Sequence, residues 1–372
     1  MDADIVLNEL FSDGAELCVE YSDGPVAYRA RWEGRPKTPP FKWGNDGEEV
    51  PAHDAWLAEL DLRLEGLEAL VSPELVKKDE SHGETDLAAV KSLLVQYAGG
   101  LQAAFLYYEC DGQKPPDTMG RMIMTQFRAL MQASKAVTPK FTPEKVDEIF
   151  TTVATGSRSL ERKVDATGAS TFDLIDFFLA IVHTAYHRYA CESGEDMASY
   201  SPLSSKLQTL MSDCFSARVF PELSKKMEKF KEAFTTGTDM LLKKGRRLTE
   251  HTLASCQLKR VKSVEVRVGL KYLCNHLARW NLLGREFSLQ DLAYFTIAAK
   301  QQSDNPEEFE LQPQPLDLNA NEFERLLLFM AHYMYRMKKK HEPFEEFLGE
   351  TLDEVYKKSN VLVDMNKLED NL

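Results

Sequence analysis

Apolar residues recur at helical spacing along most of this chain. Between His53 and Leu70 they fall on one side of a single amphipathic helix. Thr142 is a favourable N-cap and Pro143 suits the first position of another helix. Strand patterns are weak after residue 50, so the predicted fold class is all-α. The predicted helices after residue 80 span 87–108, 121–134, 142–153, 172–190, 223–236, 264–280, 288–301, 320–340 and 343–358.

The apolar pattern repeats after 146 residues. Phe141 and Phe287 each precede a helix, and 35 residues later Asp176-Phe177 and Glu322-Phe323 each place an acid before a phenylalanine. The same offset aligns Met122, Met124, Phe127, Met131 and Val137 with Val268, Leu270, Leu273, Leu277 and Leu283. This period is too long for a solenoid unit, so it indicates two copies of one small four-helix domain.

The repeat divides the chain into five predicted segments. They are an acidic irregular arm with one amphipathic helix (1–86), a first helical domain (87–192), a linker (193–222), a second helical domain (223–342), and a C-terminal helix and tail (343–372). We expect each domain to have its own core, with Phe177 and Phe323 buried equivalently.

The first helix of the second domain fits the first domain better at a shorter offset. Residues 237–263 are then interpreted as an insertion rich in lysine and arginine. The shorter offset aligns Phe230, Ala233 and Phe234 with Leu101, Ala104 and Phe105.

Two helix–loop–helix pairs in each domain suggest EF-hand geometry. A calcium loop places oxygen ligands at positions 1, 3, 5, 7, 9 and 12, with glycine at position 6. With Asp176 at position 12, the calcium candidates are Asp176, Asp165 at position 1, Thr167 at position 3 and Asp173 at position 9. Position 5 is Ala169, position 6 is not glycine, and aspartate at position 12 is short for bidentate binding. We therefore expect the geometry without the metal.

The other loops fit calcium less well. The loop after Cys110 starts with Asp111, but this count places Pro115 at position 5 and Met122 at position 12. Counting back from Glu322 places Leu311 at position 1, which has no side-chain oxygen.

Several stretches of the chain resemble degenerate EF-hand pairs. Such pairs recur in proteins of cilia and flagella, where they decorate axonemal microtubules or the complexes attached to them. The resemblance covers about residues 90–190 and, more weakly, 223–340, where Met334-Tyr335-Arg336 departs from the pattern. It implies a structural or binding role without catalysis. The stretches are Leu101-x-x-x-Phe105, Phe141-Thr142, Asp176-Phe177 and Ala185-Tyr186-His187-Arg188-Tyr189.

The net charge of −14 is concentrated at the N-terminus. Residues 1–90 hold 21 acidic and 8 basic side chains, while the remainder holds 38 and 37. The chain thus lacks the basic excess of a nucleic-acid-binding protein, and no apolar run approaches the roughly 18 residues of a membrane helix. Trp32, Phe41 and Trp43 lie among glycines and prolines of the arm. We expect them to anchor an extended arm on a basic partner surface; packing on the protein's own helices is the alternative.

Two basic clusters are candidates for contact with an acidic partner such as tubulin. The first is Lys243, Lys244, Arg246 and Arg247. An ordinary solvated surface is the alternative explanation for it. The second, at Arg336 and Lys338 to His341, ends a helix, where positive charge complements the helix dipole.

Catalytic patterns are weak in this sequence. His183, His187 and Cys191 have zinc-like spacing on one helix face, but residues at the edge of a helical core would look the same. Glycine-rich phosphate loops and a G-x-S-x-G motif are missing, so we expect neither an enzyme nor a cofactor. The six scattered cysteines indicate reduced, intracellular thiols.

These patterns together predict a non-enzymatic structural or adaptor protein of the ciliary or flagellar axoneme, in the cytoplasm and cytoskeleton. Its expected partners are axonemal proteins, with tubulin as a further candidate, in a large assembly without nucleic acid or membrane. The alternatives are a soluble calcium-responsive regulator that uses the loop from Asp165 to Asp176, and a metalloenzyme around His183 and His187.

Overall fold

The computed structural model describes residues 83–112, 120–156, 170–192, 202–228, 230–256, 268–284, 286–300, 317–338 and 342–359. The arm with Trp32, Phe41 and Trp43 lies outside the described residues, as do the helix predicted at 53–70 and the loop positions Asp165, Thr167 and Ala169. Helices make up 79% of the described part, so the all-α prediction is confirmed.

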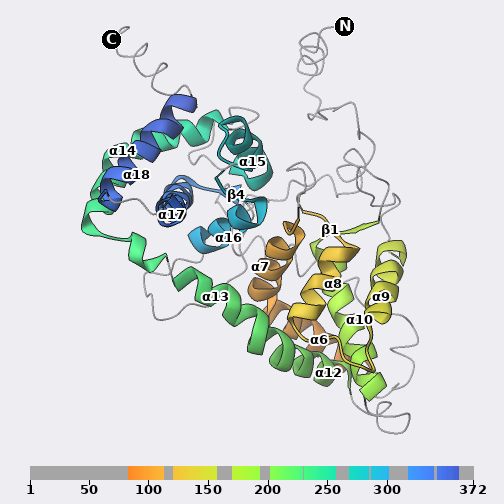
Figure 1. Ribbon diagram of the computed structural model, residues 1–372. Helices are drawn as coiled ribbons and strands as arrows, with labels where there is room; N and C mark the ends of the chain where they lie inside the picture. The colour runs from red at the N-terminus through yellow and green to blue at the C-terminus, as the bar shows by residue number, and fades with distance from the viewer. Residues whose placement is uncertain are drawn as a thin grey trace, which may run out of the picture.

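Within its described residues, the first copy of the repeat contains four helices and two very short strands (Figure 1). A further helix, α6 (Gly83–Gln96), precedes it. Strands β1 and β2 pair antiparallel, with Met122 opposite Phe172. The elements of this copy are α7 (Ala98–Glu109), β1 (Met122–Ile123), α8 (Met124–Ala133), α9 (Pro143–Gly156), β2 (Thr171–Phe172) and α10 (Leu174–Glu192).

The second copy has the same order of elements. Strands β3 and β4 pair antiparallel, with Val268 opposite Leu318. The C-terminal helix α18 (Phe344–Lys358) packs on α14 and α17 of this copy. The elements of this copy are α14 (Thr236–Ser255), β3 (Val268–Gly269), α15 (Leu270–Arg279), α16 (Leu289–Lys300), β4 (Asp317–Leu318) and α17 (Ala320–Lys338).

The two copies share one backbone path in the 146-residue register. Lys135 and Asn281, 146 residues apart, are the two non-glycine residues with positive φ in the described chain, at 56° and 59°. The next turn repeats too, since Thr138 N donates to Phe141 O at 2.9 Å and Gly284 N donates to Phe287 O at 2.8 Å. The 146-residue register therefore relates equivalent backbone hydrogen bonds in the two copies, although their side chains differ.

The shorter offset predicted for the first helix of the second copy is wrong. Helix α14 ends 146 residues after α7, and the residues that follow them, Cys110 and Cys256, are both 1% exposed. Most of the predicted insertion is therefore helical. Thr235 starts this helix, because its Oγ1 accepts from Thr238 N at 3.1 Å while Thr238 Oγ1 accepts from Thr235 N at 2.9 Å.

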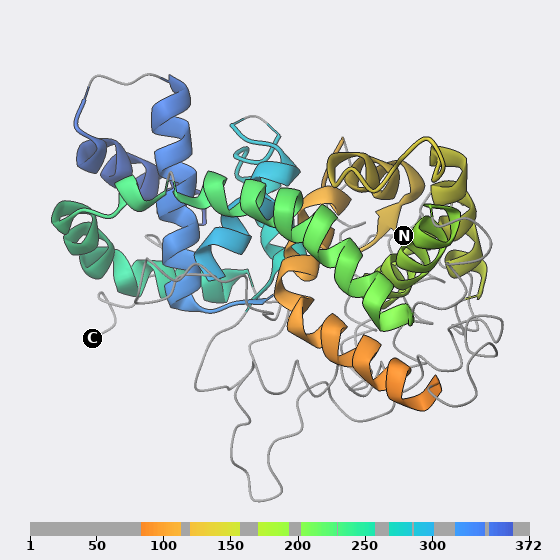
Figure 2. The same cartoon turned by 90° about the horizontal axis from the view of Figure 1, so that it is seen from below.

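A long helix occupies much of the predicted linker and runs from one copy to the other (Figure 2). Its apolar residues Leu203, Leu207 and Leu210 are buried at helical spacing where α12 packs on α10 and α6. Phe220 then lies so close to α7 that a Cβ on Gly100 would approach its ring to 2.6 Å. This long helix consists of α12 (Leu203–Leu210), a π-helical segment η2 (Met211–Val219) and α13 (Phe220–Glu228).

The prediction of two separate cores is wrong, because buried side chains of both copies form one continuous cluster. The Tyr107 ring of α7 meets the Tyr294 ring of α16 edge-on at 6.4 Å. Phe230, which follows the long helix, stacks on Phe329 of α17 at 4.5 Å. The prediction for Phe177 and Phe323 is confirmed, since both side chains are fully buried.

Candidate functional site

The two calcium candidates within the described chain form the N-terminal cap of α10. Asp173 Oδ1 accepts from the backbone N of Ile175 at 2.9 Å and of Asp176 at 3.0 Å. Asp176 Oδ2 in turn accepts from Asp173 N at 3.1 Å. Both carboxylates thus satisfy backbone donors at the start of a helix, which is a sufficient structural role for them.

The second copy repeats this cap and adds a cation. Asn319 and Glu322 exchange reciprocal hydrogen bonds at the start of α17, at 2.9 Å and 2.8 Å. The Lys300 ammonium at the end of α16 lies 3.3 Å from Glu322 Oε2, and the two side chains are only 4% and 14% exposed. Glu322, which holds position 12 in this copy, is therefore paired with a cation from the chain itself, Lys300.

Strand pairing changes the count in the loop before α8. With Asp176 at position 12, Phe172 holds position 8 of its loop. Met122 faces Phe172 across the strands, so Met122 also holds position 8 and position 12 falls on Gln126. The count that placed Met122 at position 12 is therefore wrong. Gln126 Nε2 donates to Glu109 O at 2.7 Å and to Asp111 O at 2.9 Å, which joins α8 to the end of α7 through a neutral amide.

Metal ligands do not converge in the described residues, where three or more histidine, cysteine or acidic side chains never group around one point. For the predicted zinc set, the His183 and His187 rings lie nearly parallel with centroids 6.3 Å apart, and the side chain of Cys191 lies outside the described part. These rings line a hollow of about 130 Å³ between α9 and α10, with Lys145 and Glu148 on its other side.

Burial changes the titration of this histidine pair. Burial, with a smaller contribution from His187, lowers the pKa of His183 from 6.5 to about 4. Burial and the Lys145 ammonium also lower the pKa of His187. Both imidazoles are therefore held neutral at neutral pH, as expected for side chains at the edge of a helical core.

We expect His183 to make the fold sensitive to acid. Below pH 6.5 the unfolded chain takes up a proton at this residue while the folded chain does not, so stability falls until about pH 4. At about 1.4 kcal/mol per pH unit, wild type should lose about 2 kcal/mol more than His183→Phe between pH 7 and pH 5. Urea denaturation of both proteins at the two pH values measures this difference, and equal losses would contradict the assignment.

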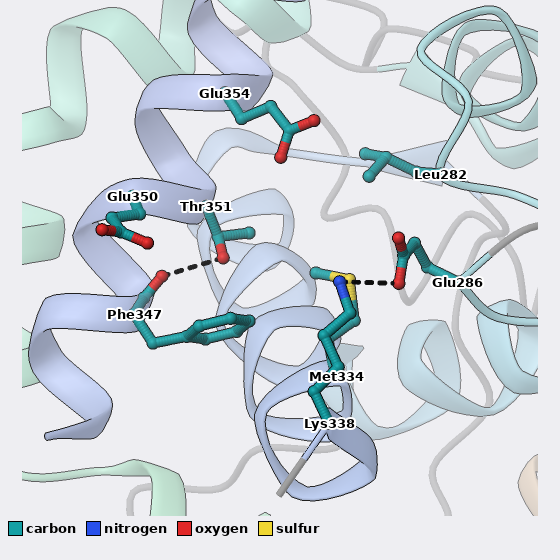
Figure 3. Close-up of a pocket in the computed structure, with 8 residues that line it drawn as sticks. All are labelled: Leu282, Glu286, Met334, Lys338, Phe347, Glu350, Thr351 and Glu354. Atoms are coloured by element: carbon teal, nitrogen blue, oxygen red, sulfur yellow. Dashed lines mark hydrogen bonds and ion pairs between the residues drawn. The ribbon is translucent and has the colours of Figure 1, made fainter. Parts of the chain in front are cut away.

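A second hollow, of about 190 Å³, lies between α17, α18 and the turn before α16 (Figure 3). Lys338 Nζ pairs with Glu286 at 2.9 Å, and Thr351 Oγ1 donates to the backbone oxygen of Phe347 at 2.9 Å. The remaining lining residues are Leu282, Met334, Glu350 and Glu354. Neither a histidine nor a cysteine is among the residues that line this hollow.

The first basic cluster lies on one helix, α14. Lys243 pairs with Asp239 at 2.6 Å, and Arg246 contacts Glu250 at 3.2 Å and Asn321 at 2.8 Å. Lys244 and Arg247, the other two members, are exposed.

In the second basic cluster, the two described residues are paired. Arg336 contacts Glu232 at 2.8 Å and Lys338 contacts Glu286 at 2.9 Å. The rest of this cluster, Lys339 to His341, lies outside the described residues.

Comparison of the chain with protein-family models, with curated proteins and with solved structures finds no match. Over the part that the structure describes, no helix has both the length and the apolar character to cross a bilayer.

Sequence reasoning missed the lysine beside Glu322. The 146-residue alignment contained a signal for it, because Lys300 falls on Ala154 of the first copy at a position where the pattern is otherwise apolar.

Proposed function

We propose that this protein is a non-enzymatic structural or adaptor component of the ciliary or flagellar axoneme. It binds microtubules or the complexes attached to them, and its partners are axonemal proteins within a large assembly. Tubulin is a further candidate partner. The observation that carries the structural, calcium-independent part of this proposal is the cap of each copy, where Asp176 and Glu322 are engaged by the chain's own donors. The axonemal location rests on the resemblance of the sequence to degenerate EF-hand pairs.

The caps favour a static role because their acids already accept hydrogen bonds from the chain itself, so the start of each helix needs no ion to hold it. In the second copy the Lys300 ammonium already supplies the positive charge. The shared core and the long helix from Leu203 to Glu228 also favour a rigid body over two modules that move independently. Such a body suits a protein that holds other components at fixed positions.

A soluble calcium-responsive EF-hand regulator is the second candidate. One observation favours it: in the first copy the side chains of Asp173 and Asp176 both bond to backbone N–H groups at the start of α10, which brings two carboxylates to the same helix end. Two neighbouring carboxylates are the kind of ligand that calcium prefers.

We expect about millimolar calcium to leave the melting temperature unchanged. An ion that binds only the folded chain at a hundredfold excess over its Kd would add about 2.7 kcal/mol. Thermal unfolding of the full chain with calcium and with a chelator measures this directly. A clear rise that Asp165→Ala abolishes would favour the regulator over the structural component.

Fractionation of cilia tests the location. The tagged full-length protein should stay with axonemes after detergent extraction and leave them only in high salt. Complete release with the detergent-soluble fraction would refute the proposal, whatever the calcium result.

A further inference from the structure

Helix α14 has a buried side and an outward side of different chemistry. Leu242, Thr249 and Thr252 are buried at helical spacing, and Gly245 lies against the Tyr356 hydroxyl of α18. The residues on the opposite side are all exposed. We call this side the outer basic face; its members are Met240, Lys243, Lys244, Arg247 and His251.

Two positive charges of this face are not paired within the described residues. Lys244 and Arg247 make neither an ion pair nor a hydrogen bond with the described part of the chain. They lie in the middle of a helix that runs from Thr236 to Ser255, so the helix dipole gives no reason for their sign. Arg336 and Lys338 differ in this respect, because each is paired with a glutamate.

The charges around the outer basic face restrict what it can bind. Asp239 lies at one end of the face and Glu250 at the other, both on the same helix. Lys243 and His251 are eight residues apart, which is about 12 Å along a helix. An extended peptide covers that length with about four residues.

We infer that the outer basic face of α14 docks a short, extended, glutamate-rich segment of a partner protein. The carboxylates of that segment pair with Lys243, Lys244 and Arg247, and Met240 provides an apolar contact beside them. This inference rests on the proposed function, because a microtubule displays many acidic tails of this chemistry. Each contact between exposed charges is weak and salt-dependent, so we expect a single acidic segment to dock weakly and to be released by salt.

Binding of the full chain to a decaglutamate peptide and to microtubules tests the inference. The test variant is Lys243→Glu/Lys244→Glu/Arg247→Glu. The matched control is Arg218→Glu/Lys225→Glu/Lys357→Glu, which changes the net charge equally at three exposed basic residues outside the face. Circular dichroism first establishes that both variants fold.

The test variant should bind both probes about tenfold more weakly at low salt, and the control less than twofold more weakly. After protease has removed the acidic tails, microtubules should bind the wild-type protein and the test variant with the same weak affinity. Equal loss in both variants would show non-specific attraction and overturn the inference. A crosslink from Lys244 to the chain's own acidic residues 1–82, with no peptide bound, would overturn it in favour of an internal occupant.

The two proposals fail in different ways. If wild type and the test variant bind the peptide equally and both stay with axonemes, the docking face is refuted and the axonemal role stands. If only the test variant loses peptide binding, but detergent removes the wild-type protein from cilia, the docking face is supported and the axonemal role is refuted.

Discussion

Phe177→Ala and Phe323→Ala should each lower the free energy of unfolding by about 3–5 kcal/mol. Both side chains are fully buried, 146 residues apart, in the first turn of the fourth helix of their copies. The Phe177 ring lies 5.4 Å from Phe105 of α7, so its loss leaves a cavity between two helices. Because the two copies share one core, either variant should still unfold in a single transition.

Chemical denaturation monitored by circular dichroism measures both effects. Met337→Ala is the control, since this side chain is 65% exposed and should change stability by no more than about 0.5 kcal/mol. A large cost for one phenylalanine and a negligible cost for the other would show that the copies are not packed equivalently. Two separate transitions would show that the shared core does not make unfolding cooperative.

Lys300→Met should be the second costly substitution, at about 3 kcal/mol. It leaves the Glu322 carboxylate in a nearly buried place without its cation, and removing one partner of a buried pair is far more costly than replacing both. The double variant Lys300→Met/Glu322→Gln should therefore recover much of the loss. If the double variant were as unstable as the sum of the single variants, the two side chains would not be coupled.

An exposed pair provides the comparison for this experiment. Lys243 and Asp239 on α14 are 2.6 Å apart, but their side chains are 72% and 58% exposed. Lys243→Met should leave the denaturation midpoint nearly unchanged, because water screens such a pair. Similar costs for Lys243→Met and Lys300→Met would contradict a special role for the buried pair.

Apolar spacing was sufficient to predict the helices and the repeat, because the buried positions of each copy must keep their order to fill the same core. The alignment of Phe177 with Phe323 depends only on that order. The helix from Leu203 to Glu228 was harder to predict, since Pro221 has no N–H and normally ends a helix. Here a π-helical segment precedes it, and Phe220 N bonds five residues back to Phe215 O.

Less of the candidate site was accessible from the sequence. Sequence spacing does not specify position 12 of the first loop, because the register depends on which residue faces Phe172 across the strands. Lys300 and Glu322 meet only after the fold brings the ends of α16 and α17 together. The outer basic face was found only in part, because Met240 and His251 join it only when α14 is known to be a helix.

The long helix between the copies also sets a distance. Its 26 residues, Leu203 to Glu228, would span at most about 39 Å at the α-helical rise, because nine of them are π-helical. The helix is packed against both copies. Phe220 lies against Gly100 of the first copy, and Phe230, just after the helix, stacks on Phe329 of the second. The helix and the shared core therefore hold the two copies at a fixed spacing, so a force applied to one copy would be transmitted directly to the other.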